Sequence, residues 1–251
     1  MDKKMEIQFQ SDIGKRRNMN QDYANVFTNQ AGMYLAILAD GMGGHLAGDV
    51  ASKMAVDGLG AAWSTSTIEQ PEEAAKWFSA EIQNVNEAIY QEGIAHPEMQ
   101  GMGTTIVSTA LLDEKFVLAH VGDSRAYLIQ NNQLQQLTDD HSLVNELLKS
   151  GEITAEMAAI HPQKNVLTRS VGIAGTIQTD ISKHQCHQND YLLLCSDGLT
   201  NMVSEENILA IVESDQTLEA KTKQLINAAN DAGGADNITV LLIHFEGEAR
   251  P

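Results

Sequence analysis

The sequence predicts a single α+β domain in which helices cover both outer faces of two stacked antiparallel β-sheets, a four-layer α-β-β-α sandwich. Three observations predict this architecture. Short β-rich runs are separated by brief turns, which favours antiparallel strands. Two pairs of helical segments interrupt these runs, one early and one late in the chain. No linker, repeat or low-complexity tract divides the 251 residues, so we expect one domain over residues 1–251.

The first part of the chain predicts three strands followed by two helices. Alternating apolar residues predict the strands, which we place at residues 5–11, 23–28 and 33–39. Residues 44–63 then show apolar side chains near helical spacing. The helix at 71–93 has the clearer pattern, because Pro71 suits the first helical position and an apolar stripe follows it.

The second part begins with three β-rich runs within residues 103–138. They meet at the short turns "LLDEKF", "VGDSRA" and "QNNQ", so we expect one antiparallel meander there. Residues 139–180 are less regular, with a helix over 142–154 that Gly151 closes. The remaining elements are strands at 191–197 and 237–245 and helices at 204–214 and 217–231.

The charge balance argues against nucleic acid and anionic membranes as partners. The chain has 16 Lys and Arg against 34 Asp and Glu, a net charge of −18, whereas phosphate-rich surfaces attract clustered basic residues. No run reaches the roughly 18 apolar residues of a membrane span, and the first residues lack an apolar signal region. Cys186 and Cys195 do not make a disulfide framework. We expect a soluble, cytoplasmic protein, with Cys195 in its core.

Four aspartates stand beside Gly or Asn at strand ends: Asp40, Asp123, Asp197 and Asp236. If such carboxylates converge at about 5 Å, each pair repels by about 3 kcal/mol at an effective dielectric near 20. A convergent cluster therefore needs protonation, basic partners or a cation. Basic residues are scarce, and oxygen ligands favour Mg²⁺, Mn²⁺ or Ca²⁺. Gly41 would let its own carbonyl approach the ion, although ordinary turn chemistry explains any single Asp-Gly pair.

The segment "SDIGKRRNMNQDYANVF" adds basic and polar groups to this acidic set. It places Arg16, Arg17, Asn20 and Asp22 just before a strand. A guanidinium near a metal cluster suits a phosphate substrate, because Arg makes paired hydrogen bonds to phosphate oxygens. Metal and Arg together indicate phosphoryl chemistry. The competing interpretation of "KRR" is a solvated run of charge.

A set of motifs now follows one another in a recognisable order: "GKRRNMNQD", "ADGMGG", "GMGTT", "VGDSRAYL", "LTDDHS", "LTRSVG", "CSDGLTN" and "GADNITV". From about residue 7 to 245 the chain resembles a bacterial-type member of the metal-dependent protein phosphatase family, protein phosphatase 2C. The resemblance implies a β-sandwich flanked by paired helices. It also implies hydrolysis of phosphoserine and phosphothreonine in proteins by a hydroxide that bridges two divalent ions, Mn²⁺ or Mg²⁺.

The same resemblance implies roles for matching residues. Asp40 would bridge two metal ions and the Gly41 carbonyl would bind one, and Asp197 and Asp236 would complete the pair. Asp123, together with Asp197, would form a third, weaker metal site.

Further roles are also implied by the family. Arg17 would hold the phosphate and Asp22 would orient the metal-bound water. Residues 139–180 would include a mobile flap beside the cleft. Phosphorylated proteins would be the partners, including a serine/threonine kinase and its substrates, in signal transduction by a monomeric phosphatase.

One position departs from the family pattern. Many eukaryotic relatives carry a His directly after the Asp-Gly pair, proposed to protonate the leaving group, and this chain has Met42. Water on the third metal, or His45, remain as alternative acids.

Two other functions are alternatives to the phosphatase. A pseudophosphatase predicts a broken metal set, but every matched Asp is present. Hydrolysis of nucleic acid does not suit a chain with this charge, while small phosphoesters remain open as substrates. The "HQCH" run at 184–187 lacks a second cluster that would complete a zinc site, and favours a polar strand edge. The sequence assigns no role to His141, and favours structural anchoring for Arg169.

Overall fold

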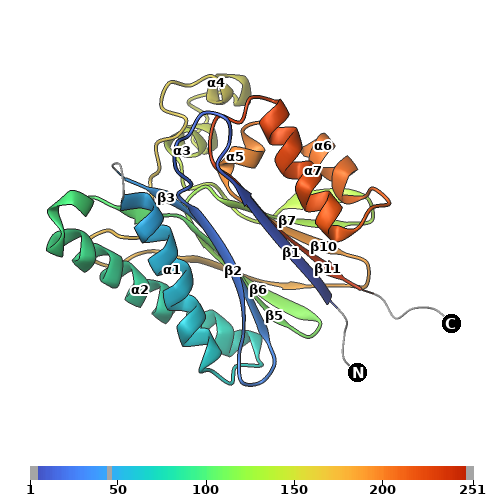
Figure 1. The fold of residues 1–251 in the computed structure, drawn as a ribbon, viewed down its shortest axis with the longest axis horizontal. Helices are drawn as coiled ribbons and strands as arrows, with labels where there is room; N and C mark the ends of the chain where they lie inside the picture. The colour runs from blue at the N-terminus through green and yellow to red at the C-terminus, as the bar shows by residue number, and fades with distance from the viewer. Residues whose placement is uncertain (1–4, 44–46, 247–251) are drawn as a thin grey trace.

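Two antiparallel β-sheets pack face to face in the computed structural model, which describes residues 5–43 and 47–246 (Figure 1). The first sheet has the order β1-β11-β10-β7-β8 and the second the order β2-β3-β5-β6-β9, with β4 paired to β3. The strands of the first sheet are β1 (Met5–Asp12), β11 (Ile238–Phe245), β10 (Tyr191–Cys195), β7 (Arg125–Gln130) and β8 (Gln133–Gln136). Those of the second are β2 (Asp22–Thr28), β3 (Tyr34–Met42), β4 (Gly103–Thr104), β5 (Ile106–Leu112), β6 (Lys115–Val121) and β9 (Asp180–Gln185).

Helices cover both outer faces of this sandwich (Figure 1). Helices α1 (Ala47–Ser64) and α2 (Pro71–Ala95) lie on the second sheet, and α5 (Asp197–Thr200), α6 (Glu205–Val212) and α7 (Leu218–Asp231) lie on the first. The short elements η1 (Pro97–Met99), α3 (Leu143–Lys149) and α4 (Ala155–Ala159) lie in the connections. The predicted four-layer α-β-β-α class is confirmed. None of the helices within the described ranges is both long enough and apolar enough to cross a lipid bilayer.

Three apolar layers hold the sandwich together. On β3 the side chains of Leu35 and Ile37 pack toward α1 and α2, while Ala36 and Leu38 pack between the sheets. Because both faces of β3 are buried, its sequence is a continuous apolar run. Burying each large aliphatic side chain contributes about 1.5–3 kcal/mol, so this strand is firmly fixed up to Asp40 at its end.

The prediction of one meander over 103–138 is wrong. Strands β5 and β6 form a hairpin in the second sheet, and β7 and β8 form a hairpin in the first. The "VGDSRA" turn between them carries the chain from one sheet to the other, with Gly122 at a φ of +112°. The apolar pattern could not reveal this step, because strands of both sheets are buried in the same way.

The segment after β8 also differs in detail from expectation. The helix predicted over 142–154 ends at Lys149, and the short α4 follows it with Thr154 as its N-cap. The first part of strand β9, residues 180–183, was not predicted, because its side chains are half-buried or exposed at the edge of the sheet and carry little apolar alternation. The "HQCH" run begins at the end of this edge strand, and Cys195 is fully buried, as predicted for both.

Candidate metal centre

The acidic residues come from five separate segments that end at the same edge of the sandwich. Asp40 on β3 pairs across the ladder with Asp22 on β2. Asp123 lies in the turn that crosses between the sheets, Asp197 begins α5 directly after β10, and Asp236 precedes β11. Six of the residues predicted from the sequence line a single cavity of about 370 Å³: Arg17, Asp40, Gly41, Asp123, Asp197 and Asp236. Asp22 lies behind this cavity and is buried.

Hydrogen bonds between backbones and side chains fix the end of β3. The Asp40 amide donates to the Thr105 hydroxyl at 3.0 Å, and the Thr105 amide donates to the Asp40 carbonyl at 2.8 Å. Gly41 packs so closely on the carbonyl oxygens of Gly48 and Gln21 that a Cβ would overlap backbone atoms. Only glycine therefore fits, and the backbone around Asp40 is held rigidly.

Two of the carboxylates have a buried oxygen that no described residue satisfies. Asp22 accepts a hydrogen bond from the Ser196 hydroxyl at 2.7 Å through Oδ2, but its Oδ1 has no partner in the described part of the chain. Asp197 accepts from the Asn201 amide at 2.9 Å through Oδ2, and its Oδ1 is likewise without a partner there. Unsatisfied buried carboxylate oxygens are costly, so such atoms point to a missing cation or water.

Burial and mutual repulsion raise the pKa values of the cluster. Desolvation is the main cause at each site. Repulsion from a neighbouring carboxylate comes second at Asp40, Asp123 and Asp197, whereas at Asp22 hydrogen bonds from hydroxyl groups oppose the rise. The pKa of Asp22 rises to about 7 and that of Asp197 to about 6. The pKa of Asp123 also rises to about 7, with Asp197 as the charged neighbour that raises it most, and that of Asp40 rises well above its ordinary value. A divalent cation would relieve this repulsion, and the all-oxygen donor set suits Mn²⁺ or Mg²⁺.

Arg17 supplies the positive charge at the mouth of the cavity. Its Nη2 donates to Asp236 Oδ2 at 2.7 Å, and about half of its side chain is exposed. A guanidinium carries five N–H donors, so one contact to Asp236 leaves others for a ligand. Arg17 therefore stands where it can reach an anion above the carboxylates.

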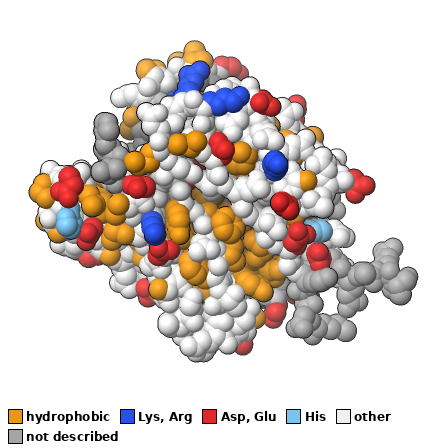
Figure 2. Space-filling view, in the orientation of Figure 1, with side chains coloured by type: hydrophobic (Ala, Val, Ile, Leu, Met, Phe, Trp, Pro, Cys, Tyr) orange, Lys and Arg blue, Asp and Glu red, His pale blue; other side chains and the backbone are white. Residues whose placement is uncertain are grey.

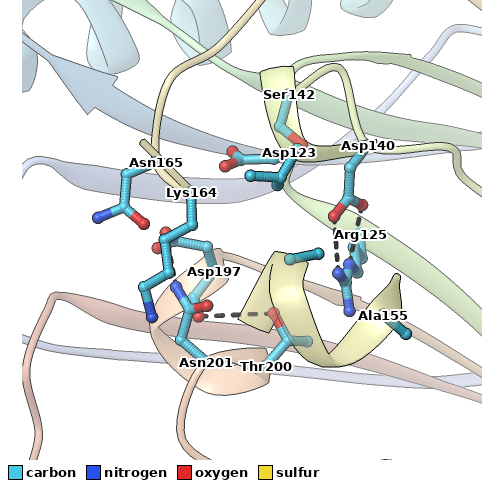
Figure 3. Close-up of a pocket in the computed structure, with 12 residues that line it drawn as sticks. Asp123, Arg125, Asp140, Ser142, Ala155, Lys164, Asn165, Asp197, Thr200 and Asn201 are labelled. Carbon is cyan, nitrogen blue, oxygen red and sulfur yellow. Dashed lines mark hydrogen bonds and ion pairs between the residues drawn. The ribbon is translucent and has the colours of Figure 1, made fainter. Parts of the chain in front are cut away.

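A second cavity of about 330 Å³ shares Asp123 and Asp197 with the first (Figure 3). Lys164 and Asn165 border it from the segment predicted to be the flap. Arg125 makes two hydrogen bonds to Asp140, at 2.8 and 2.6 Å, on its other side. This cavity therefore extends the acidic site from Asp123 and Asp197 toward residues 139–180.

Sequence reasoning missed several residues that build the site. Thr105, Arg125, Asp140 and Asn201 stood inside motifs that the sequence analysis quoted, yet no role was assigned to them. Their positions in the motifs indicated that these four residues matter, but only the fold shows which group each of them contacts. Asn237 is similar, because it accepts from the Gln21 amide and ties the arginine-rich segment to β11.

The question of the general acid involves two residues. Met42 lines the cavity and offers no titratable group. His45, the alternative acid, lies outside the described residues.

Comparison with known proteins gives a consistent match over nearly the whole chain. The family described as protein phosphatase 2C matches residues 14–242. Protein phosphatase PhpP of Streptococcus pneumoniae is 49% identical over 244 residues, which are 97% of this chain and 99% of that protein.

Two solved structures are similar in fold and sequence. The S. agalactiae serine/threonine phosphatase superposes with a TM-score of 0.94 at 46% identity, covering 97% of this chain and all of that one. The catalytic domain of the serine/threonine protein phosphatase PstP, solved in complex with two manganese ions, superposes with a TM-score of 0.86 at 30% identity, covering 97% of this chain and 99% of that one. The chain belongs to the protein phosphatase 2C family, the metal-dependent protein serine/threonine phosphatases, in its bacterial form.

Proposed function

We propose that the acidic end of the sandwich hydrolyses phosphoserine and phosphothreonine in proteins, with two Mn²⁺ or Mg²⁺ ions as cofactors. One observation carries this proposal: carboxylates with raised pKa values, two of them with an unsatisfied buried oxygen, converge beside the half-exposed Arg17. The manganese ions held by the similar PstP domain support it. Arg17 contacts the acidic cluster at Asp236 and lines the same cavity, so it can also bind a phosphate there.

We assign the metal ligands as follows. Asp40 would serve as a ligand to both ions from the rigid end of β3, and the Gly41 carbonyl would bind one of them. Asp197 and Asp236 would complete the ligand set from the first sheet. Asp123 would hold a third, weaker ion together with Asp197, which is the neighbour that most raises the Asp123 pKa after burial.

When bound, the ions would supply Lewis acidity at the phosphate and would activate water as the nucleophile. The chain's own residues orient the reaction. Asp22 lies behind Asp40, fixed by Ser196, and its Oδ1, which no described residue satisfies, can accept a hydrogen bond from the attacking water. Arg17 binds the phosphate oxygens and stabilises the charge that develops on them.

Substrate and partner assignments follow the same proposal. Residues 139–180 act as a flap that borders the second cavity through Lys164 and Asn165. Phosphorylated proteins, including a serine/threonine kinase and its substrates, are the partners. The described Lys and Arg side chains form no continuous basic track on the face that Figure 2 shows, which favours protein over nucleic acid as substrate. A monomeric, cytoplasmic enzyme remains our prediction.

The assignment of Asp197 gives the most direct test of the site. We expect Asp197→Ala to fold but to lose Mn²⁺-dependent phosphate release from a phosphothreonine peptide by more than about 100-fold, because several kcal/mol of metal-derived stabilisation disappear. Asp231→Asn, an exposed acidic position on α7, is the matched control and should keep normal turnover. Wild-type turnover in Asp197→Ala would refute the metal assignment.

A further inference from the structure

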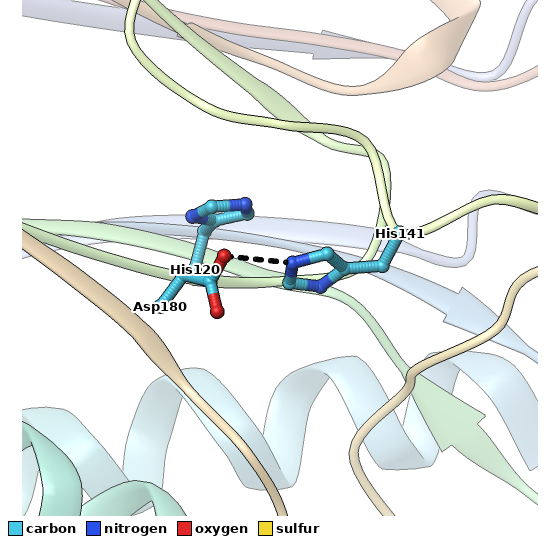
Figure 4. A group of neighbouring side chains, drawn as sticks. All are labelled: His120, His141 and Asp180. Atoms are coloured by element: carbon cyan, nitrogen blue, oxygen red, sulfur yellow. Dashed lines mark hydrogen bonds and ion pairs between the residues drawn. The ribbon is translucent and has the colours of Figure 1, made fainter. Parts of the chain in front are cut away.

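Three side chains outside the carboxylate cluster form a group of the kind that binds transition metals: His120, His141 and Asp180 (Figure 4). His120 on β6 and Asp180 on β9 face each other across the ladder, and His141 comes from the segment after β8. One ligand atom from each lies within 4.8 Å of the others. The two rings stack with centroids 4.6 Å apart, and both histidines are buried.

The hydrogen bonds of His141 argue against a metal at this group. The Gly122 amide donates to His141 Nδ1 at 3.0 Å. A backbone amide only donates, so Nδ1 carries the lone pair and the proton of the neutral ring sits on Nε2. Nε2 then donates to Asp180 Oδ2 at 3.3 Å, and Asp180 accepts from Arg169 at 2.7 Å. Nε2, the ring nitrogen that faces His120 and Asp180, therefore carries a proton that is bonded to Asp180, and it has no lone pair for a metal ion.

The same residue instead holds both polar groups of Gly122. Besides the bond to its ring, the Gly122 carbonyl accepts from the His141 amide at 3.0 Å. Gly122 has a φ of +112°, and a Cβ there would meet the side chain of Thr105. This glycine is the point where the chain crosses between the sheets, and it directly precedes Asp123. Fixing its peptide groups therefore fixes the direction in which the Asp123 side chain leaves the backbone.

The crossing turn is also held from its other side. The hydroxyl groups of Ser124 and Thr105 are 2.7 Å apart, and Thr105 accepts from the Asp40 amide. Asp123 thus lies between Ser124, which is linked to Asp40 through Thr105, and Gly122, which is bonded to His141. These hydrogen bonds fix the distance between Asp40 and Asp123 even before any ion binds.

His141 further connects this turn to the base of the predicted flap. Its carbonyl accepts from the Thr168 amide at 2.9 Å, and the adjacent Ser142 and Leu167 form a β-bridge. Arg169 reaches the same Asp180 that receives the ring proton of His141. The C-terminal part of the flap segment therefore meets His141 twice, through Thr168 at its carbonyl and through Asp180 at its ring.

We propose that His141 is a positioning residue, which orients Asp123 for the third ion by holding Gly122 and links that turn to the flap base. The inference rests on the proposed role of Asp123. It assigns the His120–His141–Asp180 group a scaffolding task beside the metal centre.

Two substitutions separate the two ring contacts. In His141→Asn the amide oxygen lies as many bonds from the backbone as Nδ1, so it can still accept from Gly122 but cannot reach Asp180. In His141→Gln the amide extends as far as Nε2, so it can reach Asp180 but leaves the Gly122 amide without an acceptor. His184→Asn is the control, since it removes a half-buried imidazole that bonds Ser182 and stacks on Phe116.

Amide exchange of the metal-free protein, followed by NMR, tests the clamp itself. We expect the Gly122 amide to be protected in wild type, in His141→Asn and in His184→Asn. In His141→Gln it should exchange about tenfold faster, since a buried amide loses its acceptor. Equal protection in His141→Gln and wild type would overturn the proposal.

Calorimetric titration with Mn²⁺ then tests the consequence. The weak site should lose about tenfold affinity in His141→Gln and keep it in His141→Asn, with the tight sites unchanged in both. If Asp123→Asn abolishes the weak site while His141→Gln retains it, the positioning inference alone fails. If the weak site survives in Asp123→Asn, the proposed role of Asp123 fails and the inference falls with it.

Discussion

Asp22 and Asp40 lie opposite each other on neighbouring strands, yet the proposal gives them different tasks. Asp40 lines the cavity and is a ligand, whereas Asp22 lies behind it and contacts Ser196. The difference comes from position relative to the cavity, because both carboxyl groups have raised pKa values.

This division of roles predicts the behaviour of Asp22→Asn. We expect kcat on a phosphothreonine peptide to fall by about 100-fold, the usual effect of losing a group that handles a proton in the reaction. Binding of the two tight Mn²⁺ ions should remain, because Asp22 is not a ligand. Steady-state kinetics with calorimetry measures both quantities. Loss of both ions in this variant would make Asp22 a ligand and contradict the account.

At the scale of elements, the site depends on the close approach of β3 to the start of α1. Gly41 packs on the Gly48 carbonyl, so the helix holds the strand end that carries Asp40. Helix α1 therefore acts on the metal centre through the backbone.

Gly41→Ala tests this contact. Its Cβ would overlap backbone oxygens that cannot move independently, so we expect the free energy of unfolding to fall by about 2 kcal/mol or more. Gly58→Ala on the exposed side of α1 is the control: it meets only the Val85 side chain and should be neutral or stabilising by up to about 1 kcal/mol. Denaturant unfolding of the metal-free proteins measures both. An unchanged denaturant midpoint for Gly41→Ala would show that α1 moves away from β3 without a loss of stability, and would contradict this account.

Most elements could be predicted from periodicity, but their assignment to sheets could not. The runs around "VGDSRA" have the same apolar character in both sheets, so a sheet crossing looked like a hairpin. The start of strand β9 could not be predicted, because edge strands with half-buried polar side chains lack the period-two alternation of apolar residues. The bonds of His141 could not be predicted either, because they join segments that only the fold brings together.

At the scale of the whole molecule, the acidic cluster links stability to pH. In the unfolded chain an Asp has a pKa near 4, while folding raises that of Asp22 to about 7. The folded state thus binds the proton more tightly, so stability present below about pH 4 is lost as the pH rises toward 7. A cation that replaces the proton removes this penalty.

Comparison of metal-free wild type with metal-free Asp22→Asn isolates this effect, because the histidines titrate equally in both. We expect the variant to be the more stable protein at pH 8, and the difference to shrink as the pH falls to 5. Thermal or denaturant unfolding across this range measures the difference. A gap that widens on acidification would show that the Asp22 pKa is not raised.

The aspartates could be identified from the sequence because they flank apolar runs. Repulsion indicated a cation if they converged, the family resemblance implied that they converge, and the fold places them around one cavity. Their identity as metal ligands remains a prediction that binding must decide.

Isothermal titration of the purified, metal-stripped protein with Mn²⁺ at neutral pH is the most direct measurement of the central claim. The account predicts two tightly bound ions per chain and a weaker third, with the tight pair lost in Asp197→Ala. A folded wild-type protein that takes up no Mn²⁺ or Mg²⁺ would contradict it.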